Sequence, residues 1–281
     1  MSGPPVDAKA FREFERAAHS RIASTYHDRF GVVTDRAVAH LLDAARVGTG
    51  TRLLDVAAGP GGLTREAARR GARVTGTDIS PAMITLARTL HPGLDFQEAS
   101  ADALPFTDAS FDAVVCAFGM GHFPDAECVL AEFSRVLAPR GFVALSWWDG
   151  FTRNRINGIF HETIAQLGLS AAGTLPAGPP MDRLSDRDRF AAFLSSAGLE
   201  DVRVQAVQFT HHLRDADELW DLAMGSFARA SSLIRAQDDA TQRKIREAVV
   251  QAAQNYAGAD GLDVPVAFLV ASGQKPERFP A

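Results

Sequence analysis

Three acidic side chains follow short apolar runs in the first half of the chain. Asp55 precedes a glycine-rich turn in LLDVAAGPGGLT, Asp78 ends the run ARVTGTD, and Asp102 lies in SADALPF. A glycine-rich turn between a strand and a helix lets a ligand approach the backbone closely. Carboxylates beside such a turn accept hydrogen bonds from hydroxyl and amino groups. The pattern therefore indicates a site for a ligand that carries several such donors.

The turn itself discriminates between ligand classes. A phosphate-binding P-loop requires G-x-x-x-x-G-K-[ST], and no lysine follows these glycines. A dinucleotide fingerprint is G-x-G-x-x-G, whereas the stretch from Gly59 is GPGGLT, with Thr64 in place of the third glycine. Asp78 lies where an acid accepts hydrogen bonds from both hydroxyls of a ribose. A ligand with a ribose, an adenine amino group and a cationic tail would use all three acids.

Strands and helices must alternate to position these residues. Apolar runs typical of buried strands cover 52–58, 72–78, 94–100, 111–119 and 141–148. Amphipathic stretches between them predict helices, and Ser80 followed by Pro81 is the N-cap pattern of one of them. Strands that alternate with helices in this way predict βαβ units and parallel pairing. The carboxyl ends of the strands would then bring the three acids to one crevice.

The rest of the chain has a different pattern. We expect helices at 154–167, 189–199, 217–227 and 238–256, a Pro/Gly loop at 171–180, and strands at 201–213 and 263–273. Pro265 favours the beginning of the last strand or a sheet edge. We predict a single domain over residues 1–281 with a binding core at 50–148. An N-terminal helix at 7–29 and two insertions, at 150–187 and 214–260, would cover that core.

Composition narrows the range of partners. The 281 residues include 29 basic and 34 acidic side chains, for a net charge of −5, and no long basic block, so nucleic acid is not the expected partner. The two cysteines, Cys116 and Cys128, have no metal or redox spacing. The N-terminal stretch lacks the apolar core of a signal peptide, and no apolar run approaches the ~20 residues of a membrane span. We therefore expect a cytoplasmic protein that makes no membrane contact.

These motifs resemble, in order, those of the class I S-adenosylmethionine (SAM)-dependent methyltransferases, particularly the small-molecule branch that includes the ubiquinone/menaquinone-type enzymes. The matching stretches are LLDVAAGPGG, GTDIS, ASADALPFTDASFDAVVCAFGMGHFPD and EFSRVLAPRGFVALSWW, which span about residues 50–148. The resemblance implies a Rossmann-like, doubly wound α/β fold. Its mostly parallel sheet would have seven strands, the last antiparallel, with helical cap insertions. Ala57 departs from the family, which often has the first glycine of D-x-G-x-G-x-G there; we expect this small change to leave binding intact.

The resemblance also implies which residues bind the cofactor, SAM. The residues expected around its methionine portion are Asp55, Ala57, Gly59 and Gly61. The ribose is expected at Asp78, and the adenine would pack against Ile79 and Met83. Asp102 would accept from the adenine amino group, and the backbone N–H of Ala103 would reach a ring nitrogen. Phe118 belongs to the same cofactor-binding set.

SAM carries an activated methyl group, so the protein must align the acceptor, exclude water and sometimes remove a proton. His122, in FGMGHFPD, is a candidate base because imidazole exchanges protons near neutral pH. The alternative for His122 is a structural histidine that orders the loop. Tyr26, in STYHDRFG, is the second candidate, as a residue of a lid over the cofactor or as a base. Its alternative is the surface end of a helix.

Acceptor-binding candidates lie in the two insertions. Trp148 and Arg153 follow the fifth strand, and Trp220, Met224 and Phe227 recur at helical spacing. The second set is also a common core-packing pattern. An aromatic-lined lid favours a mostly apolar acceptor. The adjacent His211 and His212 have no partner at metal-ligand spacing, so no metal is expected.

The sequence thus predicts methyl transfer from SAM to an oxygen, nitrogen or carbon atom of a medium-sized, fairly apolar metabolite or natural product. Two alternatives stay open. One is a protein of the methyltransferase fold that uses SAM for another purpose. The other is a nicotinamide-dependent oxidoreductase with a degenerate fingerprint, against which Thr64 and the pair Asp55 and Asp102 argue. Pairing of two copies through the N-terminal helix is a further open point.

Overall fold

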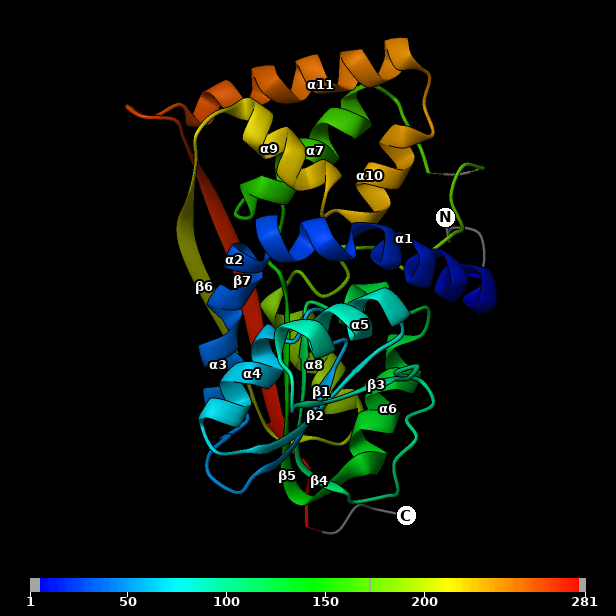
Figure 1. Cartoon of the computed structure of the whole chain (residues 1–281), viewed down its shortest axis with the longest axis vertical. Coiled ribbons are helices and arrows are strands. Elements are labelled where there is room, and N and C mark those ends of the chain that lie inside the picture. Colours follow the sequence, from blue (N-terminus) through cyan, green and yellow to red (C-terminus); the bar gives the residue numbers. More distant parts are fainter. Residues whose placement is uncertain (1–5, 172, 278–281) are drawn as a thin grey trace.

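The computed structural model describes residues 6–171 and 173–277, and is built around one seven-stranded sheet of order β3-β2-β1-β4-β5-β7-β6 (Figure 1). The first five residues and Ala172 of the predicted 171–180 loop lie outside the described residues. The strands are β1 (Arg52–Val56), β2 (Arg73–Asp78), β3 (Asp95–Glu98), β4 (Phe111–Ala117), β5 (Leu137–Trp148), β6 (Glu200–Leu213) and β7 (Leu262–Gln274). Strands β1 to β5 pair in parallel, and β7 is antiparallel to both neighbours. The predicted doubly wound, mostly parallel sheet with an antiparallel last strand is confirmed.

The strand order places a crevice at the carboxyl ends of β1 and β4. The chain winds from β1 outward to β2 and β3 and then returns to β4 on the other side of β1. The connections that follow β1 and β4 thus run in opposite directions across the sheet. In α/β sheets, ligands bind at such a switch point. The central strands are buried on both faces, as Leu53, Leu54, Val114 and Val115 show. The sheet therefore gives the crevice a rigid floor.

Helices that pack directly on the sheet come mostly from the alternating part of the chain. They are α3 (Val38–Ala44), α4 (Gly62–Arg69), α5 (Pro81–Leu90), α6 (Ala126–Val136) and α8 (Arg187–Ser196). The hydroxyl of Ser80 caps α5 by accepting from the N–H of Met83 at 3.3 Å, and Pro81 is its first residue, as predicted. Helix α6 ends at Val136, three residues before Pro139. Leu137 already pairs with Phe111, so β5 begins directly after the helix, and a register shift absorbs the proline segment.

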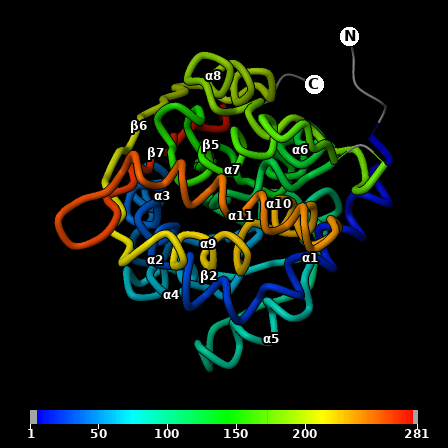
Figure 2. Tube along the Cα trace, turned by 90° about the horizontal axis from the view of Figure 1, so that it is seen from above, coloured from blue at the N-terminus to red at the C-terminus, as the bar shows by residue number. Residues whose placement is uncertain are grey.

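A second layer of helices lies across the carboxyl edge of the sheet. Helix α1 (Ala8–Arg29) runs along this edge, and α7 (Arg155–Gln166), α9 (Ala216–Met224), α10 (Ala228–Arg235) and α11 (Asp239–Ala253) lie beyond it (Figure 1). From above, α1 borders α9 and α10 (Figure 2), and α1 contacts α10 directly. The predicted helix at 217–227 is α9, which ends at Met224, earlier than expected; Gly225 is its C-cap, and Phe227 is already the N-cap of α10. Short turns complete the set: α2 (Gly31–Thr34), η1 (Asp35–Ala37), η2 (Met120–His122) and η3 (Gln254–Tyr256).

Pro265 is tolerated in β7 for a local reason. It pairs with Thr210 of β6, whereas pairing with β5 begins only at Phe268. One side of β7 thus has no neighbouring strand at Pro265, so the missing N–H breaks no ladder bond there. Strand β7 lies between β5 and β6 over most of its length, but at Pro265 only β6 is beside it. Pro265 thus lies near the beginning of the strand and at a local sheet edge, as predicted.

Among the described residues, no helix combines the length and the apolar character that a membrane span needs.

Candidate active site

A cavity of about 450 Å³ lies between the carboxyl edge of the sheet, α1 and the outer helices. Its lining on the sheet side includes Asp55, Gly59, Asp78 and Asp102. Its lining on the helix side is largely apolar and includes Phe30, Trp148, Phe151, Phe160, Met181, Phe227 and Leu233. One enclosed space therefore joins the predicted cofactor acids to an aromatic wall.

The glycine turn has three left-handed residues, Ala57 (φ +57°), Gly59 (φ +53°) and Gly61 (φ +87°). Gly59 lines the cavity, and its N–H donates to the Asp78 carboxylate at 3.0 Å. Gly61 does not line it; a Cβ atom there would come within 2.6 Å of the Phe96 ring. Gly61 therefore supports packing of the turn on the sheet, and its expected contact with the cofactor stays a prediction.

Asp78 is held in place at the end of β2. Its second carboxylate oxygen accepts from the N–H of Ser80 at 2.8 Å, in addition to the bond from Gly59. Burial raises the pKa of Asp78, while these two bonds and the nearby His19 oppose the rise. The carboxylate lines the cavity with its orientation set by the backbone. This is the position expected for a ribose acceptor.

Asp55 is only 1% exposed and accepts a hydrogen bond from the hydroxyl of Thr64 at 2.7 Å. Burial raises its pKa to about 7, against the effect of the Thr64 bond. Thr64 also packs against Gly76 of β2, where an added Cβ would lie 2.9 Å from the hydroxyl. Thr64, which replaces the third glycine of the fingerprint, thus holds the carboxylate of Asp55 in place before the turn.

The adenine end of the predicted site differs in part from expectation. Ile79, Met83 and Asp102 line the cavity, but Ala103 does not. The N–H of Ala103 donates to the carbonyl of Ser100 at 3.1 Å, because residues 100–103 close a tight turn. In this structure the turn thus occupies the N–H that was expected to reach a ring nitrogen, and that contact stays a prediction. Asp102 accepts from the hydroxyl of Ser100 at 2.6 Å and also pairs with Arg12 of α1.

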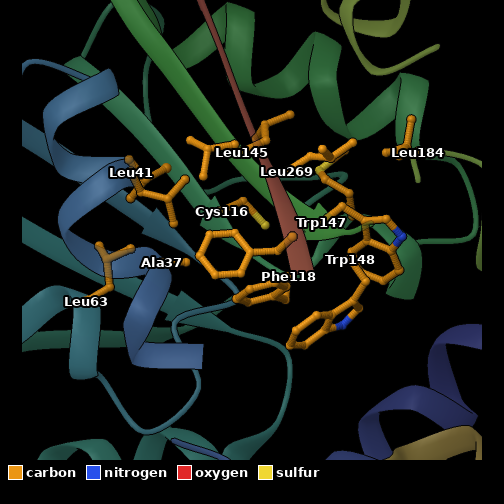
Figure 3. Close-up of a cluster of buried hydrophobic side chains, with 14 of the residues drawn as sticks. Ala37, Leu41, Leu63, Cys116, Phe118, Leu145, Trp147, Trp148, Leu184 and Leu269 are labelled. Carbon is orange, nitrogen blue, oxygen red and sulfur yellow. The ribbon is translucent and has the colours of Figure 1, made fainter. Parts of the chain in front are cut away.

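Phe118, a predicted cofactor residue, and Trp148, a predicted acceptor residue, both line the cavity. Their rings stack with centroids 4.1 Å apart and belong to the buried cluster that also contains Cys116, Leu145 and Leu269 (Figure 3). Phe118 has φ +56°, which is unusual for a bulky residue. It marks the sharp turn from β4 into the loop of His122.

Three of the five acceptor-binding candidates lie outside the cavity lining. Trp148 lines the cavity, whereas Arg153, Trp220 and Met224 do not. Arg153 forms a two-point ion pair with Asp149, at 2.5 and 2.7 Å. Trp220 and Met224 pack against the core on α9, because the helix break turns only Phe227 toward the cavity. The aromatic face of α7 supplies the remaining wall, and periodicity alone could not show which side of α7 faces the site.

His122 lines the cavity and belongs to a cluster that the sequence did not reveal. Its Nδ1 lies 3.1 Å from Oε2 of Glu15, which is on α1 and only 3% exposed. His19, one turn along α1, approaches His122 edge-on, with ring centroids 4.8 Å apart. Burial acts to raise the pKa of Glu15, but the charge of His122 and its hydrogen bond lower it below its usual range. The spacing of Glu15 and His19 on one helical face was the only available sequence signal.

Glu15, His19 and His122 are close enough together to ligate a metal ion. Two contacts favour hydrogen bonding instead. Nδ1 of His19 lies 2.9 Å from the carbonyl of Glu15, which can only accept, so that nitrogen carries a proton. The guanidinium of Arg229 lies 3.9 Å from Oε1 of Glu15, where it repels a cation.

Tyr26 lines the cavity from the C-terminal part of α1, as a lid residue would. Burial raises the pKa of its phenol to about 12. The phenol is therefore protonated near neutral pH, which argues against Tyr26 as a base. Its ring packs edge-on against Phe30, with centroids 5.8 Å apart.

Comparisons with known proteins agree with this geometry. Residues 54–145 match the family described as "Methyltransferase domain". An uncharacterized protein of Mycobacterium tuberculosis is 42% identical over 117 residues, which are 40% of this chain and 43% of that protein. The demethylmenaquinone methyltransferase of Renibacterium salmoninarum is 29% identical over 170 residues, 58% of this chain and 72% of that enzyme.

Among solved structures, a putative methyltransferase from an antibiotic biosynthesis pathway of Anabaena variabilis has a TM-score of 0.58 at 18% identity. The match covers 84% of this chain and 96% of that one, so the shared fold extends well beyond the sequence match. The chain therefore has the Rossmann-like fold of solved methyltransferases, and its sequence is similar to the methyltransferase domain family over residues 54–145 and to a demethylmenaquinone methyltransferase over 170 residues.

Proposed function

We propose that the protein transfers the methyl group of SAM to a medium-sized, mostly apolar small molecule enclosed beneath its outer helices. The observation that carries this proposal is the single cavity, which continues from Asp78 and Gly59 to the aromatic wall of Trp148 and Phe160. A methyl group must pass directly from the sulfur to the acceptor, so both ligands have to share one water-poor space.

The sheet side fits the cofactor. Asp78 is oriented by two backbone N–H groups and would receive the ribose hydroxyls. Asp55, buried beside the turn, would compensate the positive charges of the methionine portion, and Ile79 and Met83 offer apolar contact to the adenine. When bound, SAM supplies a methyl group on a sulfonium ion with a good leaving group. The residues of the chain would then only have to bind the acceptor, orient it toward the methyl group and exclude water.

The helix side fits an apolar acceptor with a few polar groups. Asn157 and Ser226 line the cavity, and Oδ1 of Asn157 and the hydroxyl of Ser226 are buried without a hydrogen-bond partner among the described residues. Such groups cost free energy unless a ligand or water satisfies them. The acceptor would therefore present hydrogen-bonding groups to these two residues. Its apolar body would pack on Trp148 and Phe160.

Isothermal titration calorimetry with S-adenosylhomocysteine, NAD and NADP tests the cofactor. We expect micromolar binding of S-adenosylhomocysteine alone. Transfer of radiolabel from [methyl-¹⁴C]SAM to an apolar metabolite library then tests the reaction, with Asp78→Ala as the negative control. Preference for a nicotinamide dinucleotide, or SAM binding without transfer to any compound, would overturn the proposal.

A further inference from the structure

The buried carboxylate of Glu15 connects the helix that covers the site to the histidine beside the transfer centre. Glu15 lies on α1, and His122 lies in the turn after β4. Oε2 of Glu15 is 3.1 Å from Nδ1 of His122, and both residues line the cavity. Glu15 is almost completely buried, so this contact is shielded from solvent.

The contact decides which nitrogen of His122 can accept a proton. A carboxylate only accepts hydrogen bonds, so Nδ1 of His122 carries a hydrogen, and in the neutral ring the lone pair is on Nε2. The ring is packed edge-on against His19 at 4.8 Å and Trp147 at 5.8 Å. These contacts fix the plane of the His122 ring, which lines the cavity, and leave Nε2 as the nitrogen that can take up a proton.

The other carboxylate oxygen of Glu15 indicates where a ligand group lies. Oε1 of Glu15 and Nη1 of Arg229 are 3.9 Å apart, and both are buried without a hydrogen-bond partner among the described residues. Arg229 also lines the cavity and lies over the rings of Phe11 and Phe14. A polar atom of the acceptor placed here would satisfy both groups and would lie next to His122.

We propose that Glu15 positions His122 as a general base, so that the acceptor is a molecule with an ionisable O–H or N–H group. Because Glu15 lies on α1, the pair is complete only while α1 covers the site. This inference rests on the proposed methyl transfer. Nε2 of His122 takes the proton of the acceptor as the freed electron pair attacks the methyl carbon. The new bond to carbon forms while the carbon–sulfur bond breaks, and S-adenosylhomocysteine leaves uncharged. The imidazolium, paired with Glu15, returns its proton to solvent after product release.

Glu15 acts here as a positioning residue. Its test therefore needs a measurement that distinguishes a changed orientation of His122 from unfolding of the protein. Long-range ¹H–¹⁵N NMR identifies the tautomer of His122, whose signals are assigned by their loss in His122→Gln. We expect a proton on Nδ1 in the wild type. In Glu15→Ala, we expect the Nε2–H tautomer that free histidine favours. The control is Glu13→Gln, an exposed acid on the same helix, which should leave the wild-type tautomer unchanged.

Kinetics provide the second readout, with 2-naphthol and 2-naphthylamine as O–H and N–H probes and 2-methylindole as a carbon acceptor. Glu15→Gln keeps the size of the side chain and removes its charge. We expect its kcat with the O–H or N–H probes to fall about 10- to 100-fold, with KM and the Kd for S-adenosylhomocysteine within about twofold of wild type.

The outcomes separate the two proposals. Absence of S-adenosylhomocysteine binding contradicts the proposed function itself. If the cofactor binds but wild-type His122 carries its proton on Nε2, only the role of Glu15 is overturned. Methylation confined to 2-methylindole, no methylation of either O–H or N–H probe, or an unchanged kcat in Glu15→Gln would overturn it as well.

Discussion

The carboxylate of Asp78 accepts a hydrogen bond from the backbone N–H of Gly59 at 3.0 Å, so the end of β2 holds the glycine turn that follows β1. Its other oxygen accepts from the N–H of Ser80, the residue that caps α5. One buried acid thus ties together two adjacent loops at the carboxyl edge of the sheet. These bonds preorganise the proposed site for the ribose, which would lower the cost of binding.

Replacement of Asp78 should therefore remove both a ligand contact and the anchor of the turn. For Asp78→Ala we expect the Kd for S-adenosylhomocysteine to rise by at least about 10- to 100-fold, to the point of undetectable binding. Asp95→Ala, an exposed acid at the other end of a neighbouring strand, is the matched control. Calorimetry measures both, with circular dichroism to verify folding. Undiminished binding in Asp78→Ala would contradict the ribose assignment.

Ala57 adopts φ +57°, a conformation that costs a residue with a Cβ atom about 1–2 kcal/mol. We predict that Ala57→Gly raises the free energy of unfolding by up to about 1 kcal/mol, because relief of strain exceeds the added flexibility of the unfolded chain. Ala58→Gly is the control, since Ala58 has no left-handed φ and should lose stability. Urea unfolding compares the two variants. Equal losses of stability in both would refute strain at Ala57.

Asp55 should make stability depend on pH. Its pKa is about 7 in the folded protein, above the ordinary 3.8, so the folded state binds this proton more tightly than the unfolded chain. The contribution of this proton to the free energy of unfolding is fully present below about pH 4 and is lost as the pH rises through 7. Asp55→Asn cannot titrate. The free energy of unfolding of the wild type minus that of Asp55→Asn should therefore be larger at pH 5 than at pH 8; a constant difference would contradict the shift.

Tyr26 should contribute little to proton transfer, because its phenol, with a pKa of about 12, is protonated at neutral pH. We expect Tyr26→Phe to keep kcat within about threefold of wild type, while His122→Ala loses about 100-fold or more. Steady-state methyl transfer at pH 7.5 with the acceptor found in the library screen measures both. A loss in Tyr26→Phe as large as that in His122→Ala would restore Tyr26 as a catalytic candidate.

The alternating core could be predicted because its signals are local. The apolar runs, the Ser80 cap and the glycine turn each specify a strand, a helix start or a loop within a few residues. Parallel pairing then brings the carboxyl ends of β1 and β2 to one edge of the sheet. Because Asp55 and Asp78 lie near the ends of apolar runs, the sequence alone assigns both residues to one crevice. The sequence could not show that Gly61 and Ala103 lie outside the cavity lining, because local packing and one turn hydrogen bond decide which atoms face the cavity.

Only the tertiary structure decided the composition of the proposed transfer centre. Glu15 and His122 are 107 positions apart, and their contact depends on how α1 crosses the sheet edge. The proposed acceptor wall likewise depends on the break between α9 and α10, which turns Phe227 inward and leaves Trp220 in the core. No periodicity encodes such relationships. They follow from the packing of apolar faces over the whole chain, where many weak contacts act together and no single stretch of sequence carries the signal.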